Sequence, residues 1–413
     1  MLNTFYDCYS ILTKVYKDKA FFKQALNSTI IEEKNRAKTT KICYGVLDRD
    51  EELSFYISSL TNKAPKQAIK TILKISMYCI KYLCSHEYAV TQNAVELTKK
   101  LGKSGASGFV NAFLRKFISF NFELPKDTIK NLSVKYSYPE FAIKRLIKDY
   151  GDETTEKIIS TKENSTWVCF YNENGEKYLQ EHGYNFTKTP FYNVFSVENF
   201  RRNEDYDKGI YTFQSIGSVA ICEVVESGEK LLDCCSAPGG KSVRLSYRFN
   251  QVNSLDIHPH RVSLIEDYAF RMNRKNITAQ LQDAKVFKED FVGAFDAVLC
   301  DAPCSGLGVV NDNPDIKLNR EENSIIELNN EQLSILNNVC KYVKKGGCLY
   351  YSTCSILKSE NIELIKKFLQ NKKDFVIEEI NSPLEHLKID GTLQFLPHIS
   401  NGVGFFVAKL RRV

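Results

Sequence analysis

The sequence predicts a doubly wound α/β domain that is preceded by an all-helical domain and a small α+β subdomain. From about residue 228 onward, short apolar runs alternate with amphipathic stretches, as in a parallel sheet with helices on both faces. In the first third of the chain, apolar residues recur at helical spacing and strand signals are scarce. The predicted domains are residues 1–125, 126–210 and 211–413.

Helical periodicity is clearest in two stretches of the first domain. Cys8, Leu12, Val15 and Tyr16 share one face of a predicted helix near the start of the chain. A second predicted helix follows Pro65, and its apolar face carries Ile69, Ile72, Leu73, Ser76, Met77 and Ile80. A third ends at Gly102, which is predicted to cap its C-terminus.

The charge of the chain is unevenly distributed. The net charge is +6, and residues 1–125 hold 19 Lys and Arg against 11 Asp and Glu by count of the sequence. A basic domain beside a nearly neutral one is typical of an enzyme with a polyanion-binding attachment. A solvated, lysine-rich surface would give the same balance, so charge alone does not separate the two interpretations.

Cysteine usage and hydropathy indicate a cytoplasmic protein. The 13 cysteines are scattered, several lie in apolar runs, and none forms a C-x-x-C pair. This pattern is typical of a reducing compartment and argues against a structural zinc site, so we expect no metal. No apolar run reaches the length of about 18 residues that a membrane span needs, and the first residues lack a secretory signal.

The α/β domain places acidic residues where its predicted strands end. "KLLDCCS", "QVNSLDI", "ITAQLQDA" and "FDAVLCDAP" are predicted strands, and they carry Asp233, Asp256, Asp283 and Asp301 at their ends. Ligands of doubly wound sheets bind at the carboxyl ends of the strands. Further along, "EQLSILNNVCKYVKKGG" is predicted to be a helix that ends at its two glycines, followed by the strand "CLYYSTCS".

The stretch "LLDCCSAPGGKS" predicts a cofactor site. A strand ends at Asp233, and a Pro-Gly-Gly turn then opens a helix whose free N–H groups face a ligand. Asp256 follows about 20 residues later, at the distance where a carboxylate accepts the hydroxyls of a ribose. Neither G-x-G-x-x-G nor the triphosphate-binding P-loop pattern is present. S-adenosylmethionine therefore fits better than a dinucleotide or a triphosphate, although a plain strand-to-helix turn remains the alternative.

Two cysteines lie just past predicted strands, among residues typical of a cleft. They are Cys304 in "DAPCSG" and Cys354 in "YSTCS". A thiolate that adds to C6 of cytosine makes C5 nucleophilic enough to accept a methyl group, and this reaction also needs a carboxyl group and a means of release. Asp301 and the two thiols provide such a set. Packing alone is the interpretation for Cys222, Cys300, Cys340 and Cys348, which lie within apolar runs.

Four segments carry a resemblance to a known family. "CSAPGGK", "DAPCSG", "NPDIK" and "STCS" resemble the signature segments of the RNA 5-methylcytosine methyltransferases. The first third, with "GFVNAFLRK", is similar to the NusB-like helical domain of the RsmB (Sun, Fmu) branch, and the ending "LPHISNGVGFFVAKLRR" is also similar to that branch. The resemblance covers nearly the whole chain, and it implies an RRM-like second domain and a methyltransferase third domain.

The resemblance implies a role for each motif residue. Cys354 would be the nucleophile that bonds C6, Cys304 would assist product release, and Asp301 would contact the target base near the methyl group. The methionine part of S-adenosylmethionine would be held by Cys235, Ser236, Ala237, Pro238, Gly239, Gly240 and Lys241, the ribose by Asp256 and the adenine by Asp283. The implied substrate is one cytidine in bacterial small-subunit (16S) ribosomal RNA, and the implied state is a monomer.

Some positions depart from the family pattern. Ser215 stands where an Asp is usual, Phe141 where a Trp is usual and Val403 where an Asp is common, and arginines that commonly precede "NPDIK" are missing. These departures concern RNA contacts, and so the target site more than the chemistry.

Three alternatives remain beside this interpretation. The same chemistry could act on transfer RNA, or the chain could be a non-catalytic RNA-binding assembly factor. A thiol hydrolase would need a histidine beside a cysteine. None of the six histidines, His86, His182, His258, His260, His386 and His398, lies in a motif with a thiol.

Overall fold

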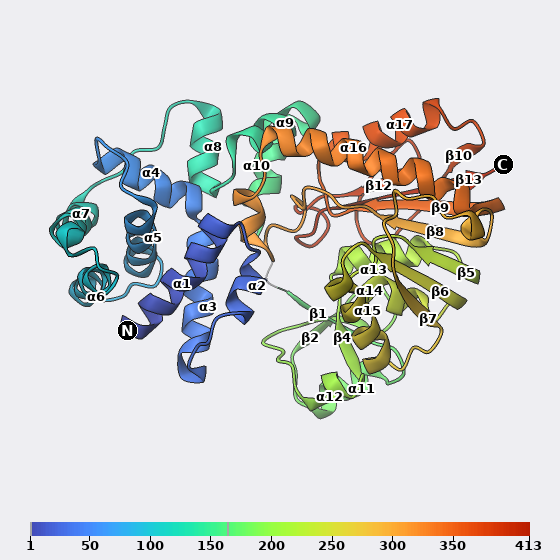
Figure 1. Ribbon diagram of the computed structural model, residues 1–413, viewed down its shortest axis with the longest axis horizontal. Coiled ribbons are helices and arrows are strands. Elements are labelled where there is room, and N and C mark those ends of the chain that lie inside the picture. Colours follow the sequence, from blue (N-terminus) through green and yellow to red (C-terminus); the bar gives the residue numbers. More distant parts are fainter. Residues whose placement is uncertain (1, 163–164) are drawn as a thin grey trace. The chain divides into compact units, whose positions relative to one another are not determined.

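The computed structural model describes residues 2–162 and 165–413, which form two compact units. One unit contains the chain up to Ser160 together with Val310–Glu321, and the other contains Thr161–Val309 and Glu322–Val413. Figure 1 shows helices in the first unit, and a large sheet flanked by helices with a smaller sheet in the second. The predicted fold class is confirmed. The three-domain division stays a prediction, and the contacts group residues 128–160 with the helices before them.

Buried side chains between residues 5 and 117 form the main apolar core of the first unit, which is built from helices. They are α1 (Leu2–Asp18), α2 (Phe22–Asn27), α3 (Glu33–Asp48), α4 (Asp50–Leu60), α5 (Gln67–Lys81), α6 (Glu87–Lys100), α7 (Ser107–Ser119), α8 (Thr128–Tyr136), α9 (Glu140–Tyr150) and α10 (Asp152–Ser160), with short 3-10 turns η1 (Ser104–Ala106) and η3 (Pro314–Leu318). Cys8, Leu12 and Ile72 are among the fully buried side chains of this core, so the two predicted apolar faces point inward.

Gly102 ends helix α6 as predicted. Its φ of +70° is left-handed, a conformation that glycine adopts without strain. The Gly102 N–H donates to Lys99 O at 2.9 Å and the Lys103 N–H donates to Thr98 O at 3.0 Å. These two bonds form a Schellman motif, which satisfies the last carbonyls of the helix.

A small antiparallel sheet begins the second unit. Its strands are β1 (Thr166–Phe170), β2 (Phe186–Lys188), β3 (Val194–Val197) and β4 (Tyr211–Phe213), in the order β2-β3-β1-β4, with α11 (Gly175–Glu181) and α12 (Glu204–Asp207) between them. All of its strand pairs are antiparallel. Phe170, Phe195 and Tyr211 pack in its own small core.

The large sheet has the order β11-β12-β13-β9-β8-β5-β6-β7, with β10 paired to β13. The strands are β5 (Gly228–Asp233), β6 (Phe249–Asp256), β7 (Ile277–Leu281), β8 (Phe295–Asp301), β9 (Val343–Thr353), β10 (Phe375–Glu378), β11 (Leu387–Ile389), β12 (Thr392–Phe395) and β13 (Phe405–Arg412). Strands β5 to β9 pair in parallel, whereas β13 runs antiparallel to β9. Strands β6 and β7 are added on one side of β5, and β8 is then added on the other side of β5. Such a switch point is where ligands bind in open α/β sheets.

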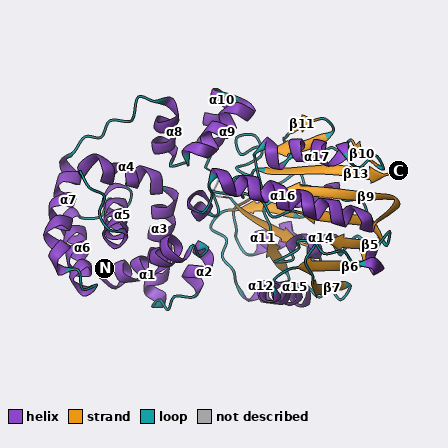
Figure 2. Ribbon diagram, turned by 45° about the horizontal axis from the view of Figure 1, so that its top comes forward, coloured by secondary structure: helices purple, strands orange, loops and turns teal. Residues whose placement is uncertain are grey.

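Helices cover both faces of this sheet, as Figure 2 shows. They are α13 (Ile216–Val224), α14 (Gly240–Leu245), α15 (Pro259–Arg271), α16 (Glu322–Val339) and α17 (Ile362–Gln370), with 3-10 turns η2 (Glu289–Phe291), η4 (Cys340–Tyr342) and η5 (Lys358–Glu360). One core cluster joins α16 and α17 to the strands, and a second joins α13 and α14 to them. Among the residues that the structure describes, no helix is long and apolar enough to cross a membrane.

The predicted end of the helix at Gly346 and Gly347 is wrong. Helix α16 ends at Val339, and β9 already begins at Val343 and includes both glycines. Gly346 has φ +77°, and the β8–β9 register shifts between Phe295 and Ala297. A Cβ on Gly347 would lie 2.7 Å from Asp296 O. The glycines therefore permit an irregular start of a strand, which resembles a helix end in sequence.

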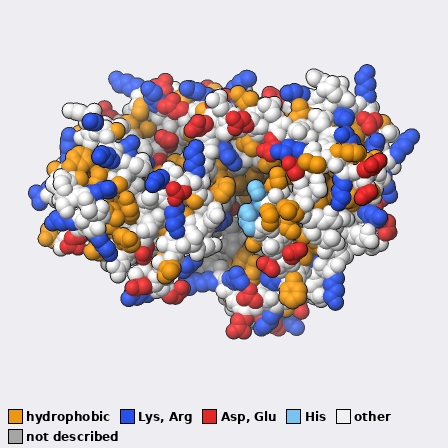
Figure 3. Space-filling view, in the orientation of Figure 1, with side chains coloured by type: hydrophobic (Ala, Val, Ile, Leu, Met, Phe, Trp, Pro, Cys, Tyr) orange, Lys and Arg blue, Asp and Glu red, His pale blue; other side chains and the backbone are white. Residues whose placement is uncertain are grey.

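The basic excess of the first third forms no single stripe on the face shown in Figure 3. Lysine and arginine side chains lie scattered there among acidic and neutral ones.

Candidate active site

Acidic residues gather at the carboxyl ends of the central strands. Asp233, Asp256 and Asp301 are the last residues of β5, β6 and β8, as predicted, and Asp283 follows two residues after the end of β7. Because these four parallel strands are neighbours, the carboxylates lie along one edge of the sheet.

The turn between β5 and α14 is held tightly by its neighbours. Gly239 has φ +104°, and a Cβ there would lie 3.3 Å from Ile265 Cα on α15. The Ser236 hydroxyl donates to Leu255 O at 3.0 Å, and Arg261 donates to Ala237 O at 3.2 Å. The turn is therefore fixed against β6 and α15 before any ligand arrives.

Asp233 is a buried carboxyl group that connects the elements on either side of this turn. Its Oδ2 accepts a hydrogen bond from the Ser242 hydroxyl at 2.6 Å, and Ser254 donates to Ser242 at 2.9 Å. Burial raises the pKa of Asp233 to about 7. The carboxyl group thus ties α14 to the ends of β5 and β6.

The chemistry of the acidic groups suits S-adenosylmethionine. Asp256 Oδ1 accepts from the His258 N–H at 3.1 Å, and its Oδ2 lies 3.5 Å from Arg261 Nη1. Asp283 Oδ1 accepts from the Lys285 N–H at 2.8 Å. Carboxylates are acceptor-only groups and match a cofactor with ribose hydroxyls, an ammonium group and a sulfonium. Among residues 2–162 and 165–413, no group of three or more His, Cys, Asp or Glu side chains could hold a metal.

Asp301 connects the turn between β5 and α14 to strand β9. Its Oδ2 accepts from Lys241 Nζ at 2.6 Å and its Oδ1 accepts from the Ser352 hydroxyl at 2.7 Å. Burial is the largest single influence and lowers the pKa of Lys241, but the charge and hydrogen bond of Asp301, together with other nearby groups, raise it overall, so the lysine stays protonated. Both oxygens of Asp301 are therefore held in place.

The two predicted thiols lie together. Cys354 follows directly after β9 and Cys304 lies three residues past β8, and their sulfur atoms are 3.1 Å apart. This closeness follows from the β8–β9 ladder, in which Asp301 is opposite Ser352. The hydrogen bond to Cys354 is the main cause that raises the pKa of Cys304 well above its ordinary value, followed by burial and by the negative charge of Glu360. Cys304 is therefore held in its thiol form.

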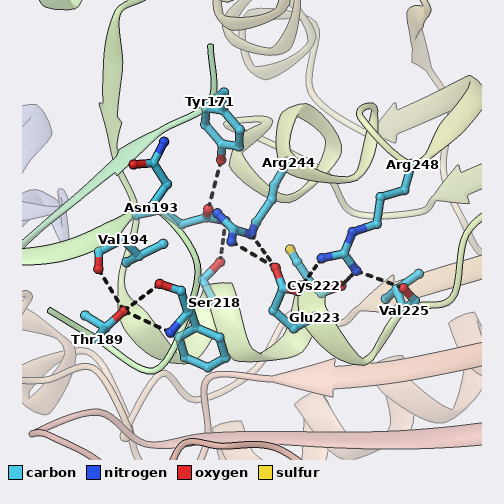
Figure 4. Close-up of polar contacts among 12 residues, drawn as sticks. Tyr171, Thr189, Asn193, Val194, Ser218, Cys222, Glu223, Val225, Arg244 and Arg248 are labelled. Carbon is cyan, nitrogen blue, oxygen red and sulfur yellow. Dashed lines mark hydrogen bonds and ion pairs between the residues drawn. The ribbon is translucent and has the colours of Figure 1, made fainter. Parts of the chain in front are cut away.

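Polar contacts also fix α13, the helix that precedes β5 (Figure 4). Gln214 accepts from the Tyr171 hydroxyl at 3.5 Å and donates to Ser218 at 3.1 Å, and Arg244 Nε and Nη2 donate to Glu223 at 3.1 and 2.9 Å. These bonds join the small sheet, α13 and α14.

The departures at Ser215 and Val403 have local structural explanations. The Ser215 hydroxyl accepts from the Ser218 N–H at 3.3 Å and so caps α13, a task that an aspartate would also perform. Val403 is buried in the core beside α13. Phe141 lies on α9, partly buried.

Two protein families match different parts of the chain. Residues 221–411 match the family described as 16S rRNA methyltransferase RsmB/F, and residues 5–119 match the NusB family. "Probable ribosomal RNA small subunit methyltransferase B" of Bacillus subtilis (strain 168) is 30% identical over 441 residues, which cover 97% of each chain. The chain belongs to the RsmB/F family. It is therefore an S-adenosylmethionine-dependent RNA cytosine methyltransferase.

Other comparisons agree with the RsmB/F assignment. "Ribosomal RNA small subunit methyltransferase B" of Escherichia coli O7:K1 (strain IAI39 / ExPEC) is 27% identical over 406 residues, covering 92% of this chain and 91% of the relative. The crystal structure of PH0851 superposes with a TM-score of 0.85 at 22% identity and covers 100% of this chain and 99% of that one, which shows a shared fold.

One motif of this RsmB/F protein lies outside the thiol site. The segment with "NPDIK" belongs to the helical unit. Asp315 accepts from the Phe22 N–H at 3.1 Å, and Lys317 Nζ donates to Asp48 O at 2.7 Å and to Asp48 Oδ1 at 3.1 Å. Lys317 and Asp315 are buried, so this motif stabilises the helical unit.

Residues that the motifs did not reveal surround the two thiols. Ser305, Ser355, Gln332 and Glu360 form a buried polar cluster next to Cys304 and Cys354. The repeated Cys-Ser pair in "PCSG" and "TCSI" is the only sequence signal that could have indicated two of them. Gln332 and Glu360 come from α16 and η5, and nothing in their local sequence marks them.

Proposed function

We propose that this protein methylates C5 of one cytidine in small-subunit (16S) ribosomal RNA through a covalent adduct between Cys354 and C6 of the base. The observation that carries the proposal is the 3.1 Å separation of the two sulfur atoms beyond the adjacent ends of β8 and β9. One thiol would explain addition to the base, and two adjacent thiols explain addition and release.

The proposed steps follow from the chemistry of cytosine. The Cys354 thiolate adds to C6, which makes C5 nucleophilic. S-adenosylmethionine, when bound, supplies the electrophilic methyl group, and a C5–carbon bond forms as the methyl–sulfur bond breaks. A base then removes the C5 proton, and the Cys354–C6 bond breaks to restore the ring. Cys304 assists this last stage, and its raised pKa supports a role as the thiol partner of a Cys354 thiolate.

Asp301 is proposed to contact the target base. Lys241 and Ser352 already hold its two oxygens, so the carboxylate has a fixed position between the cofactor turn and the thiols. The segment Cys235 to Lys241 is proposed to hold the methionine part of the cofactor, Asp256 the ribose and Asp283 the adenine. The position of these groups along one edge of the sheet supports this assignment.

Ribosomal RNA is the proposed substrate because of the relatives. Both curated relatives carry the name of a ribosomal RNA small subunit methyltransferase, and both span more than nine tenths of this chain. The target base would have to leave its stack to reach the partly buried thiols. The basic first third would contact phosphates, which makes binding salt-sensitive. We further propose a monomer in the cytoplasm, and the 13 free cysteines suit a reducing compartment.

A trapped adduct tests the proposal. Cys304→Ala protein is incubated with S-adenosylmethionine and small-subunit ribosomal RNA, and in a second reaction with S-adenosylmethionine and transfer RNA. The products of each reaction are separated on a denaturing gel. We expect a stable protein–RNA band with ribosomal RNA that disappears in the Cys304→Ala/Cys354→Ala double variant. The matched control is Cys84→Ala, which removes an exposed thiol on the helical unit and should turn over without an adduct.

Each other outcome contradicts part of the proposal. A band that survives loss of Cys354 would show another nucleophile. A band with transfer RNA alone would keep the chemistry and change the substrate. Absence of a band together with absence of cofactor binding would favour a non-catalytic RNA-binding protein.

A further inference from the structure

The two Cys-Ser pairs lie side by side. The Cys304 and Cys354 sulfur atoms are 3.1 Å apart, and the hydroxyl oxygens of Ser305 and Ser355 are also 3.1 Å apart. Both serines are fully buried, whereas the two cysteines are only partly buried. The thiols are therefore the accessible members of the two pairs, and the serines face the interior.

A single buried carboxylate holds both serines. Glu360, the last residue of η5, accepts from the Ser305 N–H at 2.8 Å and from the Ser355 hydroxyl at 2.5 Å. Gln332 of α16 donates to the same carboxylate at 3.0 Å and to Pro303 O at 2.9 Å. A carboxylate is acceptor-only and so can receive all three bonds at once. Both thiol segments are thus bound to one side chain.

The next residue fixes the segment around Cys354 further. Asn361 accepts from the Thr353 hydroxyl at 2.6 Å, and its amide donates to Ser355 O at 2.9 Å and to Gln394 at 2.7 Å. The residues on either side of Cys354 are therefore both bound to Asn361, which is fully buried.

Burial of Glu360 has an energetic cost that stability alone does not explain. Glu360 is 0% exposed, and the hydrogen bonds described for its carboxylate come from Ser305, Ser355 and Gln332, none of which carries a positive charge. Removing a carboxylate from water without a cation is unfavourable, and an apolar residue of similar size would pack there at lower cost. A functional reason is that this carboxylate sets the geometry of the two thiols.

We propose that Glu360 is a positioning residue of the methyltransferase, which sets the separation of Cys304 and Cys354 and thereby controls release of the covalent RNA adduct. This inference rests on the proposed function. Formation of the adduct needs one thiol, Cys354. Release needs both thiols at a defined distance, so loss of Glu360 should slow release more than addition. A misplacement of about 1 Å in an active site is enough to slow a step by roughly a hundredfold.

Glu360→Gln tests the proposal. The variant keeps the shape of the side chain but places an amide where Ser355 donates, and it removes the charge. We expect adduct formation in a single turnover and cofactor affinity within about twofold of the native protein, release slowed by roughly tenfold to a hundredfold, and adduct accumulation on denaturing gels. The pH profile of release should also move to lower pH, because the charge of Glu360 helps to raise the pKa of Cys304.

Two further variants separate positioning from a general structural defect. Glu363→Gln changes an exposed carboxylate at the start of α17 and should release product at the native rate. In a Cys304→Ala background, where release is already blocked, Glu360→Gln should leave the rate of adduct formation in a single turnover unchanged, because the thiol that it positions is gone. If Glu360→Gln does not fold, Ser355→Ala replaces it as the test. This variant removes one of the three hydrogen bonds to the Glu360 carboxylate and should accumulate the adduct to a smaller extent.

Three results would overturn the inference. Release by Glu360→Gln at the native rate would remove the positioning role. Equal losses in adduct formation and release, with an unchanged pH profile, would indicate a structural role only. Slower adduct formation by Glu360→Gln in the Cys304→Ala background would show that Glu360 acts on something other than Cys304. Absence of an adduct from Cys304→Ala protein is a different result, because it refutes the proposed function itself.

Discussion

Lys241 Nζ lies 2.6 Å from Asp301 Oδ2, and this ion pair joins the turn after β5 to the end of β8. The two side chains are 14% and 26% exposed, so the pair is neither fully buried nor fully solvated. The pair connects the proposed cofactor segment directly to the residue proposed to contact the base.

Removal of Lys241 should therefore affect methyl transfer more than folding. In Lys241→Met, the Asp301 carboxylate loses one of its two partners and gains freedom to move. We expect turnover to fall by roughly a hundredfold, while the thermal midpoint changes by only a few degrees. Methylation of RNA with labelled S-adenosylmethionine measures turnover, and thermal unfolding measures the midpoint. Lys230→Met, an exposed lysine on β5, is the control and should change neither. Native turnover in Lys241→Met would show that the pair has no catalytic role.

Reactivity of Cys304 should depend on Cys354. The pKa of Cys304 is raised first by its hydrogen bond to Cys354, then by burial. In Cys354→Ala this main cause disappears, so the Cys304 thiolate should form at lower pH and react sooner with iodoacetamide. Labelling rates between pH 7 and pH 10 or so, followed by mass spectrometry of the Cys304 peptide, measure the shift. An unchanged labelling profile in Cys354→Ala would mean that the two thiols do not interact in solution.

Asp233 should make the protein less stable as pH rises toward neutrality. Its pKa in the folded state is raised to about 7 by burial, above its ordinary value of 3.8. Between pH 3.8 and about 7, the folded state therefore binds more protons than the unfolded state. The stability that the protonated Asp233 carboxyl group contributes is fully present below pH 3.8 and is lost as pH rises through about 7. The largest possible slope for one group is about 1.4 kcal/mol per pH unit.

Asp233→Asn removes this ionisation. Its free energy of unfolding relative to the native protein should therefore increase as pH rises from about 4 to about 7, and urea unfolding at several pH values measures the difference. Asp267→Asn, an exposed aspartate on α15, is the control and should show no such trend. A difference between native and Asp233→Asn proteins that does not change with pH would show that Asp233 is ionised when folded.

The sequence by itself determined the fold class and most of the strand ends. Helical periodicity around Ile72 and the left-handed Gly102 are local features, because the 3.6-residue repeat and the need for positive φ are properties of neighbouring residues. Asp233, Asp256 and Asp301 could be placed at strand ends for the same reason. The end of α16 was predicted wrongly, because Gly346 and Gly347 permit both a helix end and an irregular strand.

Only the tertiary structure decided what surrounds the thiols. Residues 304 and 354 come together because β8 and β9 pair in parallel, and Gln332 and Glu360 reach them from a helix and a 3-10 turn that are distant in sequence. The segment with Asp315 and Lys317 likewise joined the helical unit through contacts that its sequence does not predict. Hydrogen bonds between distant residues depend on strand order and helix packing, and these are properties of the whole chain and not of any one motif.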